Sequence, residues 1–213
     1  MSNITNEYIS EYIRAIIPNK DSIFKEIEKY ADEYKVPIIE PEVAQLISVL
    51  IKILKPKRIL EVGAAIGYSA LIMANSYEYS EILTIERNEN MIDKAKNNIE
   101  NSKFSNRIKI LNGDANEILP ELDEEFDLVF LDAAKGQYVE FFKHASRMLR
   151  NGGVIVSDNV LFKGMVASDD LVIRRKKTIV KRLRTYLEYI NNIEGYTTTI
   201  LPISDGVAIT YKD

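Results

Sequence analysis

Residues 59–70 read ILEVGAAIGYSA: an apolar run, two glycines four positions apart, and a second apolar run. The first run favours a buried β-strand that ends at Gly63, and the pattern from Gly67 onward is typical of a helix. In open α/β sheets, ligands bind beyond the carboxyl ends of the strands, where such a loop would lie. Both glycines would let a ligand approach the backbone closely.

The same strand-then-helix rhythm continues along the chain. Strand-like runs occur at 58–63, 81–86, 107–113, 126–132 and 152–158, and helical patterns at 67–76, 88–102, 115–121, 136–149 and near 169–192. Two last β runs, 196–203 and 206–212, are joined by Ser-Asp-Gly, which indicates a hairpin. The sequence therefore predicts an α/β fold: a Rossmann-like, doubly wound, seven-stranded, mostly parallel sheet with one antiparallel strand at its C-terminal end.

Three helical patterns precede the first strand, over residues 6–17, 21–35 and 41–54. We find neither a linker nor a repeat after them. The chain is therefore expected to form one domain, 1–213, with an N-terminal helical part (1–55) and an α/β core (56–213).

Composition excludes several kinds of site. The 213 residues include no cysteine and a single histidine, His144, which excludes thiolate metal sites and disfavours a Ser-His-Asp triad. The first 17 residues carry acids and no continuous apolar run, and no stretch approaches the length of a membrane span. We expect a cytoplasmic protein without membrane contact.

The glycine loop and the strand ends suggest the ligand. The Gly-x-x-x-Gly spacing matches neither a dinucleotide fingerprint nor a P-loop, so NAD and ATP are disfavoured. An acid lies at or near each of five successive strand ends, which suits ribose hydroxyls, an ammonium and a cationic centre; S-adenosylmethionine carries all three. Any one of these acids could equally cap a helix. They are Glu61, Glu86, Asp114, Asp132 and Asp158.

Residues 131–138, LDAAKGQY, place Lys135 three positions after Asp132 at a strand end. Alone, the pair fits a salt bridge, and the later Asp158-Asn159 fits an Asx turn. Together at neighbouring strand ends they also fit a metal site with a nearby base. Tyr138 fits either the wall of an acceptor pocket or plain packing.

In this order, LEVGAAIGYSA, IERN, GDA, LDAAKGQY and VSDNVLFKG resemble the metal-dependent class I S-adenosylmethionine O-methyltransferases of the catechol and caffeoyl-CoA type. The resemblance covers residues 35–213. It implies that Lys135 is the catalytic base, that Asp132 also lies beside the cofactor, and that the metal ligands are Asp132, Asp158 and Asn159. The other implied cofactor-binding residues are Ile39, Glu61, Gly63, Ser69, Glu86, Asp114 and Ala115.

The donor set agrees with the implied chemistry. Two carboxylates and an amide offer only oxygen ligands, which suits Mg²⁺ or another divalent cation. A cation would make an acceptor hydroxyl more acidic, and Lys135 could take its proton.

The acceptor is suggested by a basic run within an acidic chain of net charge −4. Such a run favours phosphate contacts, although it also fits a solvated helix face or a dimer contact. With DNVLFKGMV before it, the run most resembles the bacterial branch that methylates 5-hydroxyuridine at the tRNA wobble position, in the anticodon loop, to 5-methoxyuridine. The candidate tRNA contacts are Arg174, Arg175, Lys176, Lys177, Lys181, Arg182 and Arg184.

Two other functions stay open. The acceptor could be a small catechol or a hydroxycinnamoyl-type compound, or the protein could hold the cofactor without turnover. The resemblance also implies a homodimer.

Overall fold

The computed structural model describes residues 4–18 and 21–213. Residues 1–3 and 19–20, part of the predicted N-terminal helical region, lie outside this description. The helices are α1 (Glu7–Ile16), α2 (Ser22–Tyr34), α3 (Pro41–Leu54), α4 (Tyr68–Ser76), α5 (Glu89–Glu100), α6 (Ala115–Glu121), α7 (Tyr138–Met148) and α8 (Lys177–Asn192). The strands are β1 (Arg58–Val62), β2 (Glu81–Glu86), β3 (Ile108–Asn112), β4 (Phe126–Leu131), β5 (Leu149–Ser157), β6 (Tyr196–Leu201) and β7 (Val207–Lys212).

The described strands form a seven-stranded sheet in the order β3-β2-β1-β4-β5-β7-β6. The first five strands in this order run parallel, and β7 runs antiparallel to both of its neighbours. This confirms the predicted fold, including the single antiparallel strand. The order reverses between β1 and β4, the place where open α/β sheets bind ligands.

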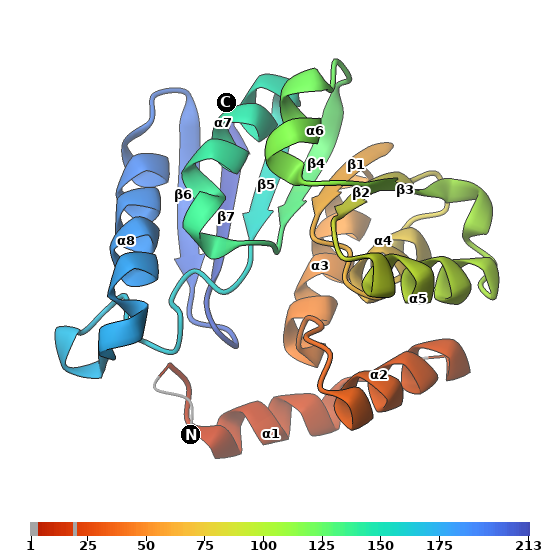
Figure 1. The fold of residues 1–213 in the computed structure, drawn as a ribbon, viewed down its shortest axis with the longest axis horizontal. Helices are drawn as coiled ribbons and strands as arrows, with labels where there is room; N and C mark the ends of the chain where they lie inside the picture. The colour runs from red at the N-terminus through yellow and green to blue at the C-terminus, as the bar shows by residue number, and fades with distance from the viewer. Residues whose placement is uncertain (1–3, 19–20) are drawn as a thin grey trace.

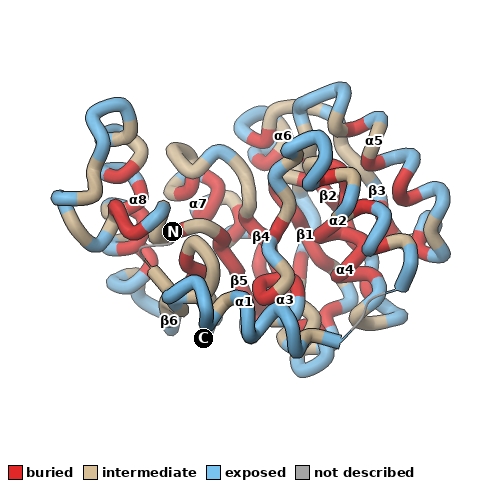
Figure 2. Tube along the Cα trace, turned by 90° about the horizontal axis from the view of Figure 1, so that it is seen from below, coloured by how far each residue is buried: buried red, intermediate tan, exposed pale blue. Residues whose placement is uncertain are grey.

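Helices cover both faces of the sheet (Figure 1). Because side chains alternate along a strand, Leu128 and Phe130 join the core beneath α3 and α4, whereas Val129 and Leu131 join the core beneath α7 and α8. Figure 2 shows buried residues running through the middle of the molecule, between the helical layers. The core thus holds the strand ends rigidly at one edge of the sheet.

One predicted helix boundary is wrong. The expected helix near 169–192 begins only at Lys177, after two short 3₁₀ turns at Asp169–Leu171 and Arg174–Lys176. The hydroxyl of Ser168 accepts from the backbone N–H of Asp170 and starts the first turn, and Val172 then leaves the helical conformation. The basic run is therefore split between a 3₁₀ turn and α8.

The N-terminal helix α1 is attached with its apolar side outward. It has no buried residue, and Tyr8, Tyr12 and Ile16 are more than 60% exposed. Its polar side is anchored: the Arg14 guanidinium donates two hydrogen bonds of 2.8 Å to the nearly buried carboxylate of Glu42, on α3. None of the described helices is long and apolar enough to cross a membrane.

Candidate active site

A cleft of about 1050 Å³ opens beyond the carboxyl ends of the parallel strands. Each of the five strands β1 to β5 contributes its last residue or one of the two residues after it. These strand-end residues are Gly63, Glu86, Asp114, Asp132 and Asp158. The structure therefore brings together, in one cleft, residues that are up to 95 positions apart in the sequence.

Sheet hydrogen bonding continues past the last strand residues and aligns these ends. The N–H of Asp132 donates to Val62 O, and the N–H of Asp158 donates to Leu131 O, each at 3.0 Å. The two aspartates are thus fixed in neighbouring positions by backbone bonds. Their relative placement does not depend on a flexible loop.

Gly63 packs directly against the backbone of Asp132. Its φ of +105° is one that residues with side chains rarely adopt, and an added Cβ would lie 2.2 Å from Asp132 O. The glycine is required for the loop to pass this close to the end of β4. It also leaves the loop backbone bare toward the cleft.

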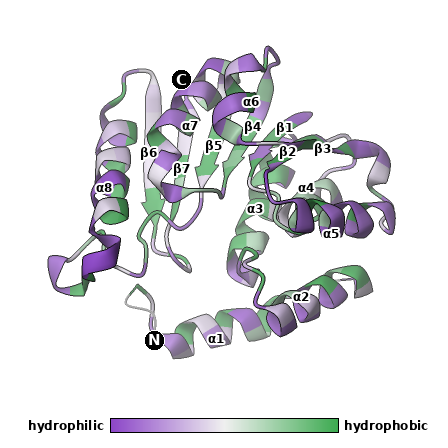
Figure 3. Cartoon of the chain, in the orientation of Figure 1, coloured by the Kyte–Doolittle hydropathy of each residue, from purple (hydrophilic) through white to green (hydrophobic). Residues whose placement is uncertain are grey.

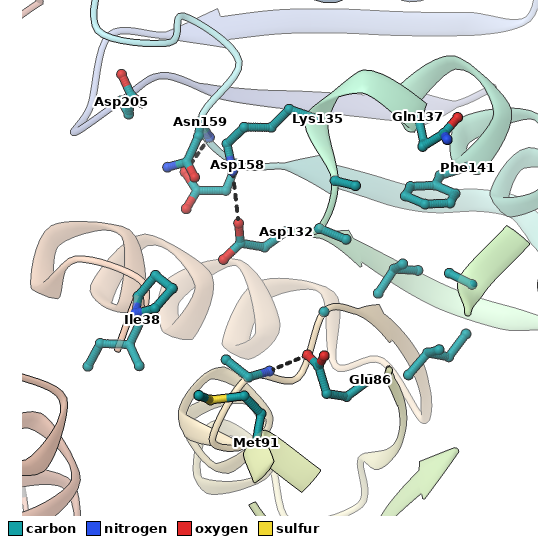
Figure 4. A pocket seen from close by; sticks show the side chains of 18 of the residues that line it. Ile38, Glu86, Met91, Asp132, Lys135, Gln137, Phe141, Asp158, Asn159 and Asp205 are labelled. Carbon is teal, nitrogen blue, oxygen red and sulfur yellow. Dashed lines mark hydrogen bonds and ion pairs between the residues drawn. The ribbon is translucent and has the colours of Figure 1, made fainter. Parts of the chain in front are cut away.

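Glu86, the last residue of β2, is held by three backbone amides. One carboxylate oxygen accepts from the N–H of Ala65, and the other accepts from the N–H groups of Arg87 and Asn88, all at 2.9 Å. Figure 4 shows this carboxylate at the wall of the cleft, near Met91. Its fixed position suits a ligand with neighbouring hydroxyls.

Asp114, after β3, has a double role. It caps α6 by accepting from the N–H of Asn116, and it lies 3.1 Å from the Arg87 guanidinium. The bond from the Asn116 backbone is the largest cause of a lowered pKa at Asp114. The helix-cap alternative is thus realised here, while Asp114 and Ala115 still line the cleft.

The ends of β4 and β5 form a charged cluster. Lys135 Nζ lies 3.7 Å from Asp132 Oδ1, and Asn159 N donates to Asp158 Oδ1 at 2.7 Å (Figure 4). Burial raises the pKa of both carboxyls, that of Asp158 to about 8, and the proximity of Asp132 adds to the effect at Asp158. A single lysine leaves this pair of acids short of positive charge.

This shortage is the observation that fits a bound cation. The residues that could hold it offer oxygen only, from Asp132, Asp158 and Asn159. In the described part of the chain, no three His, Cys, Asp or Glu side chains gather closely enough to hold a metal ion. A site here would therefore need the amide of Asn159 as its third protein ligand.

Glu61, unlike the other four acids, is not part of the cleft wall. It is fully buried; one oxygen accepts from the Thr84 hydroxyl, and the other has no hydrogen-bond partner within the described residues. The nearby Ser69 hydroxyl favours the charged form of Glu61, although it does not reach hydrogen-bond geometry with Glu61 Oε1. Burial raises the pKa of Glu61 to about 7.

This burial predicts a pH-dependent stability difference for Glu61→Gln. The pKa of about 7 in the folded state exceeds the ordinary glutamate pKa of 4.5, so ionisation costs the wild-type protein stability as the pH rises between these values. The full cost above pH 7 is about 3 kcal/mol. Urea unfolding of the ligand-free protein should show Glu61→Gln to be more stable than wild type at pH 8, and equally stable at pH 4.5.

The matched control is Glu78→Gln, at an exposed glutamate. It should leave stability unchanged at both pH values. A Glu61→Gln variant that is destabilised at pH 8 would contradict the assignment of Glu61 as a costly buried charge.

Two other predicted cofactor residues also lie outside the cleft wall. Ile39 is buried in the core, and its neighbours Pro37, Ile38 and Glu40 line the cleft instead; Ser69 is buried in α4. The predicted segment thus lines the cleft through the residues on either side of Ile39, while the Ile39 side chain packs into the core.

The structure adds cleft residues that the sequence did not indicate. Ser10 and Arg14 come from α1, and Asp205 comes from the β6–β7 turn, where its carboxylate accepts from the N–H of Lys163. The Ser-Asp-Gly turn signalled only a hairpin. Because β6 runs in the same direction as β1 to β5, the β6–β7 turn lies at the same edge of the sheet as the other strand ends. The predicted strand directions could therefore have indicated Asp205 as a cleft residue.

The basic run adjoins the cleft but is not uniform. Arg174, Arg175, Lys177, Lys181 and Arg182 are exposed. Lys176 Nζ lies 5.6 Å from the centre of the Phe162 ring, and the Arg182 guanidinium donates to Gly136 O, next to Lys135. Arg184 instead donates to Val166 O and Met165 O and pairs with Asp169 at 2.7 Å, so its guanidinium is engaged in the structure.

Fold and site together define a Rossmann-like methyltransferase. Residues 17–213 match the family model described as O-methyltransferase, and the chain belongs to this family.

Relatives of known structure and sequence agree. A Staphylococcus aureus structure provisionally named a caffeoyl-CoA O-methyltransferase is 35% identical, with a TM-score of 0.91 over 97% of this chain and 100% of the other. A Bacillus cereus O-methyltransferase in complex with SAH is 26% identical, with a TM-score of 0.85 over 97% of each chain. Catechol O-methyltransferase of Niastella koreensis is 31% identical over 80% of each chain.

Proposed function

We propose that this O-methyltransferase transfers the methyl group of S-adenosylmethionine to the 5-hydroxyl of 5-hydroxyuridine at the wobble position of tRNA, giving 5-methoxyuridine. The observation that carries the proposal is the Lys135 ammonium beside two buried aspartates, in a cleft that adjoins an exposed basic segment.

The cofactor is assigned to the β1–β3 side of the cleft. There the bare Gly63 loop, the fixed Glu86 carboxylate and the Asp114–Ala115 segment provide a close backbone approach, a ribose acceptor and an adenine wall. The Bacillus cereus relative was solved in complex with SAH, which supports a cofactor of this class. The cofactor supplies a methyl carbon on a positively charged sulfur.

The chemical step is assigned to the β4–β5 side. Lys135, in its unprotonated form, accepts the acceptor hydroxyl's proton at Nζ; the oxygen then bonds to the methyl carbon as the carbon–sulfur bond breaks, leaving S-adenosylhomocysteine. Asp132, Asp158 and Asn159 would hold Mg²⁺ or another divalent cation. Such a cation would supply Lewis acidity and fix the orientation of the acceptor. Holding both reactants in this geometry accounts for much of the rate.

Removing divalent cations should abolish turnover. We expect methyl transfer by the purified protein to fall to background in EDTA and to return when Mg²⁺ is added in excess, because two buried carboxylates would otherwise face the reaction with one lysine as their only close counter-charge among the described residues. The measurement is label transfer from S-adenosylmethionine. Full activity in EDTA would contradict the metal role.

The basic segment is proposed to contact tRNA phosphates. It lies at the end of the molecule that carries the strand tips, and Figure 3 shows it strongly hydrophilic. The proposed contacts keep six of the seven predicted residues, Arg174, Arg175, Lys176, Lys177, Lys181 and Arg182, and leave out the engaged Arg184. The wobble base lies in a single-stranded loop, where an unpaired base can be splayed out and enter a cleft.

The acceptor is tested by comparing separate reactions, each with a different acceptor. The protein is incubated with labelled S-adenosylmethionine, Mg²⁺ and one of three acceptors: tRNA carrying 5-hydroxyuridine, the same tRNA with uridine, or catechol. We expect label only in the hydroxylated tRNA, with binding that weakens steeply as salt rises. Label in catechol alone would overturn the tRNA proposal.

A phenolic acceptor is the second candidate, favoured by the relatives. The names of the Niastella koreensis protein and of a Stellaria longipes caffeoyl-CoA O-methyltransferase (26% identical over 96% of this chain and 90% of that protein) point to catechol-type acceptors. Caffeoyl-CoA therefore joins the panel as a fourth acceptor. Label in none of the four would instead favour a cofactor-binding module without turnover.

A homodimer is proposed from the outward apolar side of α1. Tyr8, Tyr12 and Ile16 form an exposed stripe opposite the anchored Arg14, and a second copy could cover it. Sedimentation should show a dimer that Ile16→Asp converts to a monomer. A monomeric wild-type protein at micromolar concentration would contradict this proposal.

A further inference from the structure

Tyr138 joins the two strand ends that carry the charged cluster. It is the first residue of α7 and is 1% exposed. Its hydroxyl donates to Asp158 O at 2.8 Å and lies 3.2 Å from Leu131 O, the last residue of β4. One phenol therefore bridges the ends of β4 and β5 from beneath, opposite the cleft.

The bridge controls one peptide group in particular. The carbonyl between Asp158 and Asn159 accepts from Tyr138, while the N–H of the same peptide donates to the Asp158 carboxylate at 2.7 Å. Both ends of this peptide plane are thus held. Asn159, which follows, has a φ of +57°, in the left-handed region that asparagine tolerates better than most residues with side chains.

The phenol is itself held on the far side from the cleft. Its ring packs edge-on against Tyr186 of α8, with centroids 5.3 Å apart, and Arg182 donates to Gly136 O in the turn just before it. Packing alone would be satisfied by phenylalanine. The hydroxyl adds a directed contact with the backbone of the cluster.

We propose that Tyr138 is a positioning residue for methyl transfer: by fixing the Asp158–Asn159 peptide against the end of β4, it sets the spacing of the oxygen donors of Asp132, Asp158 and Asn159. This inference rests on the proposed metal role of these three residues. It assigns to Tyr138 no contact with either substrate. Groups that orient metal ligands typically alter metal affinity or activity by 10- to 100-fold when removed.

The test compares Tyr138→Phe with Tyr186→Phe. The Tyr186 hydroxyl is equally buried and bonds to the side chain of Ser157, one residue before Asp158, but it does not touch the cluster backbone. For each variant, Mn²⁺ affinity is measured by calorimetry with S-adenosylhomocysteine present, together with kcat, the KM for S-adenosylmethionine, and the melting temperature.

We expect Tyr138→Phe to weaken Mn²⁺ binding and lower kcat by about tenfold or more, with the KM for S-adenosylmethionine unchanged. Both variants should lower the melting temperature by similar amounts, because each loses one buried hydroxyl. Tyr186→Phe should nevertheless keep wild-type Mn²⁺ affinity. Wild-type Mn²⁺ affinity in Tyr138→Phe, or an equal loss of Mn²⁺ affinity in both variants, would overturn the role of Tyr138 but leave the metal proposal standing. Absence of Mn²⁺ binding in the wild-type protein would overturn the metal proposal and this inference with it.

Discussion

Replacing Lys135 with alanine should lower kcat for methyl transfer by about 10²- to 10⁴-fold, the range that a positioned general base contributes. Lys135 Nζ lies 3.7 Å from Asp132 Oδ1, and its side chain is only 22% exposed, so the amine is held inside the cleft instead of moving freely in solvent. Because Lys135 is assigned to the proton of the acceptor hydroxyl, cofactor binding should survive the substitution. Single-turnover label transfer and calorimetric titration with S-adenosylhomocysteine measure the two effects separately.

Lys143→Ala is the matched control for this experiment. Lys143 also pairs with an acid three positions earlier, Glu140 at 2.8 Å, but it lies exposed on the outer part of α7. It should leave kcat unchanged. If Lys135→Ala retained more than a tenth of wild-type turnover, the base assignment would be wrong.

Gly63→Ala should destabilise the protein by about 3–5 kcal/mol and eliminate cofactor binding. The φ of +105° is unfavourable for alanine, and the new Cβ would lie 2.2 Å from Asp132 O and 2.8 Å from Asp132 C. Neither atom is the end of a flexible side chain, so the glycine loop or the end of β4 must move. Urea unfolding and S-adenosylhomocysteine titration measure the two losses.

Gly195→Ala separates backbone strain from the steric clash. Gly195 also has a positive φ, +76°, but an added Cβ there would meet nothing within 4 Å. It should cost about 1 kcal/mol and leave cofactor binding intact. Equal stability of the two variants would show that the contact between Gly63 and Asp132 carries no constraint.

The strand positions could be predicted because each buried run ends in a glycine or an acid. These glycines and acids at the strand ends mark the edge of the cleft. The residues that line it are Gly63, Glu86, Asp114, Asp132 and Asp158. Their meeting follows from parallel topology alone, without knowledge of any contact.

The features that the sequence did not predict depend on long-range contacts, or on which side of a strand a given residue faces. Glu61 and Val62 are adjacent on β1, so one must point away from the cleft, and nothing local indicates which. The sequence of residues 169–176 is compatible with a polar helix, yet α8 begins only at Lys177. Arg184, from α8, donates to Val166 O and Met165 O and so holds the loop that precedes this segment. The outward direction of the apolar stripe of α1 could not be predicted locally, because it depends on the ion pair between Arg14 and Glu42.

The reversed direction of β7 has a consequence for how the enzyme can diversify. A parallel strand must leave the ligand edge through a segment that feeds a helix, and here those segments carry the Gly63 loop, Glu86 and the charged cluster. The β6–β7 turn has no following helix to position, yet it delivers Ser204 and Asp205 to the cleft. The turn is linked to the segment just before α1 by a hydrogen bond from the Thr5 hydroxyl to Pro202 O. The turn and α1 together form a part of the cleft wall that lies outside the parallel strands. Selection for a new acceptor can therefore act on these two segments while the inherited chemistry stays intact.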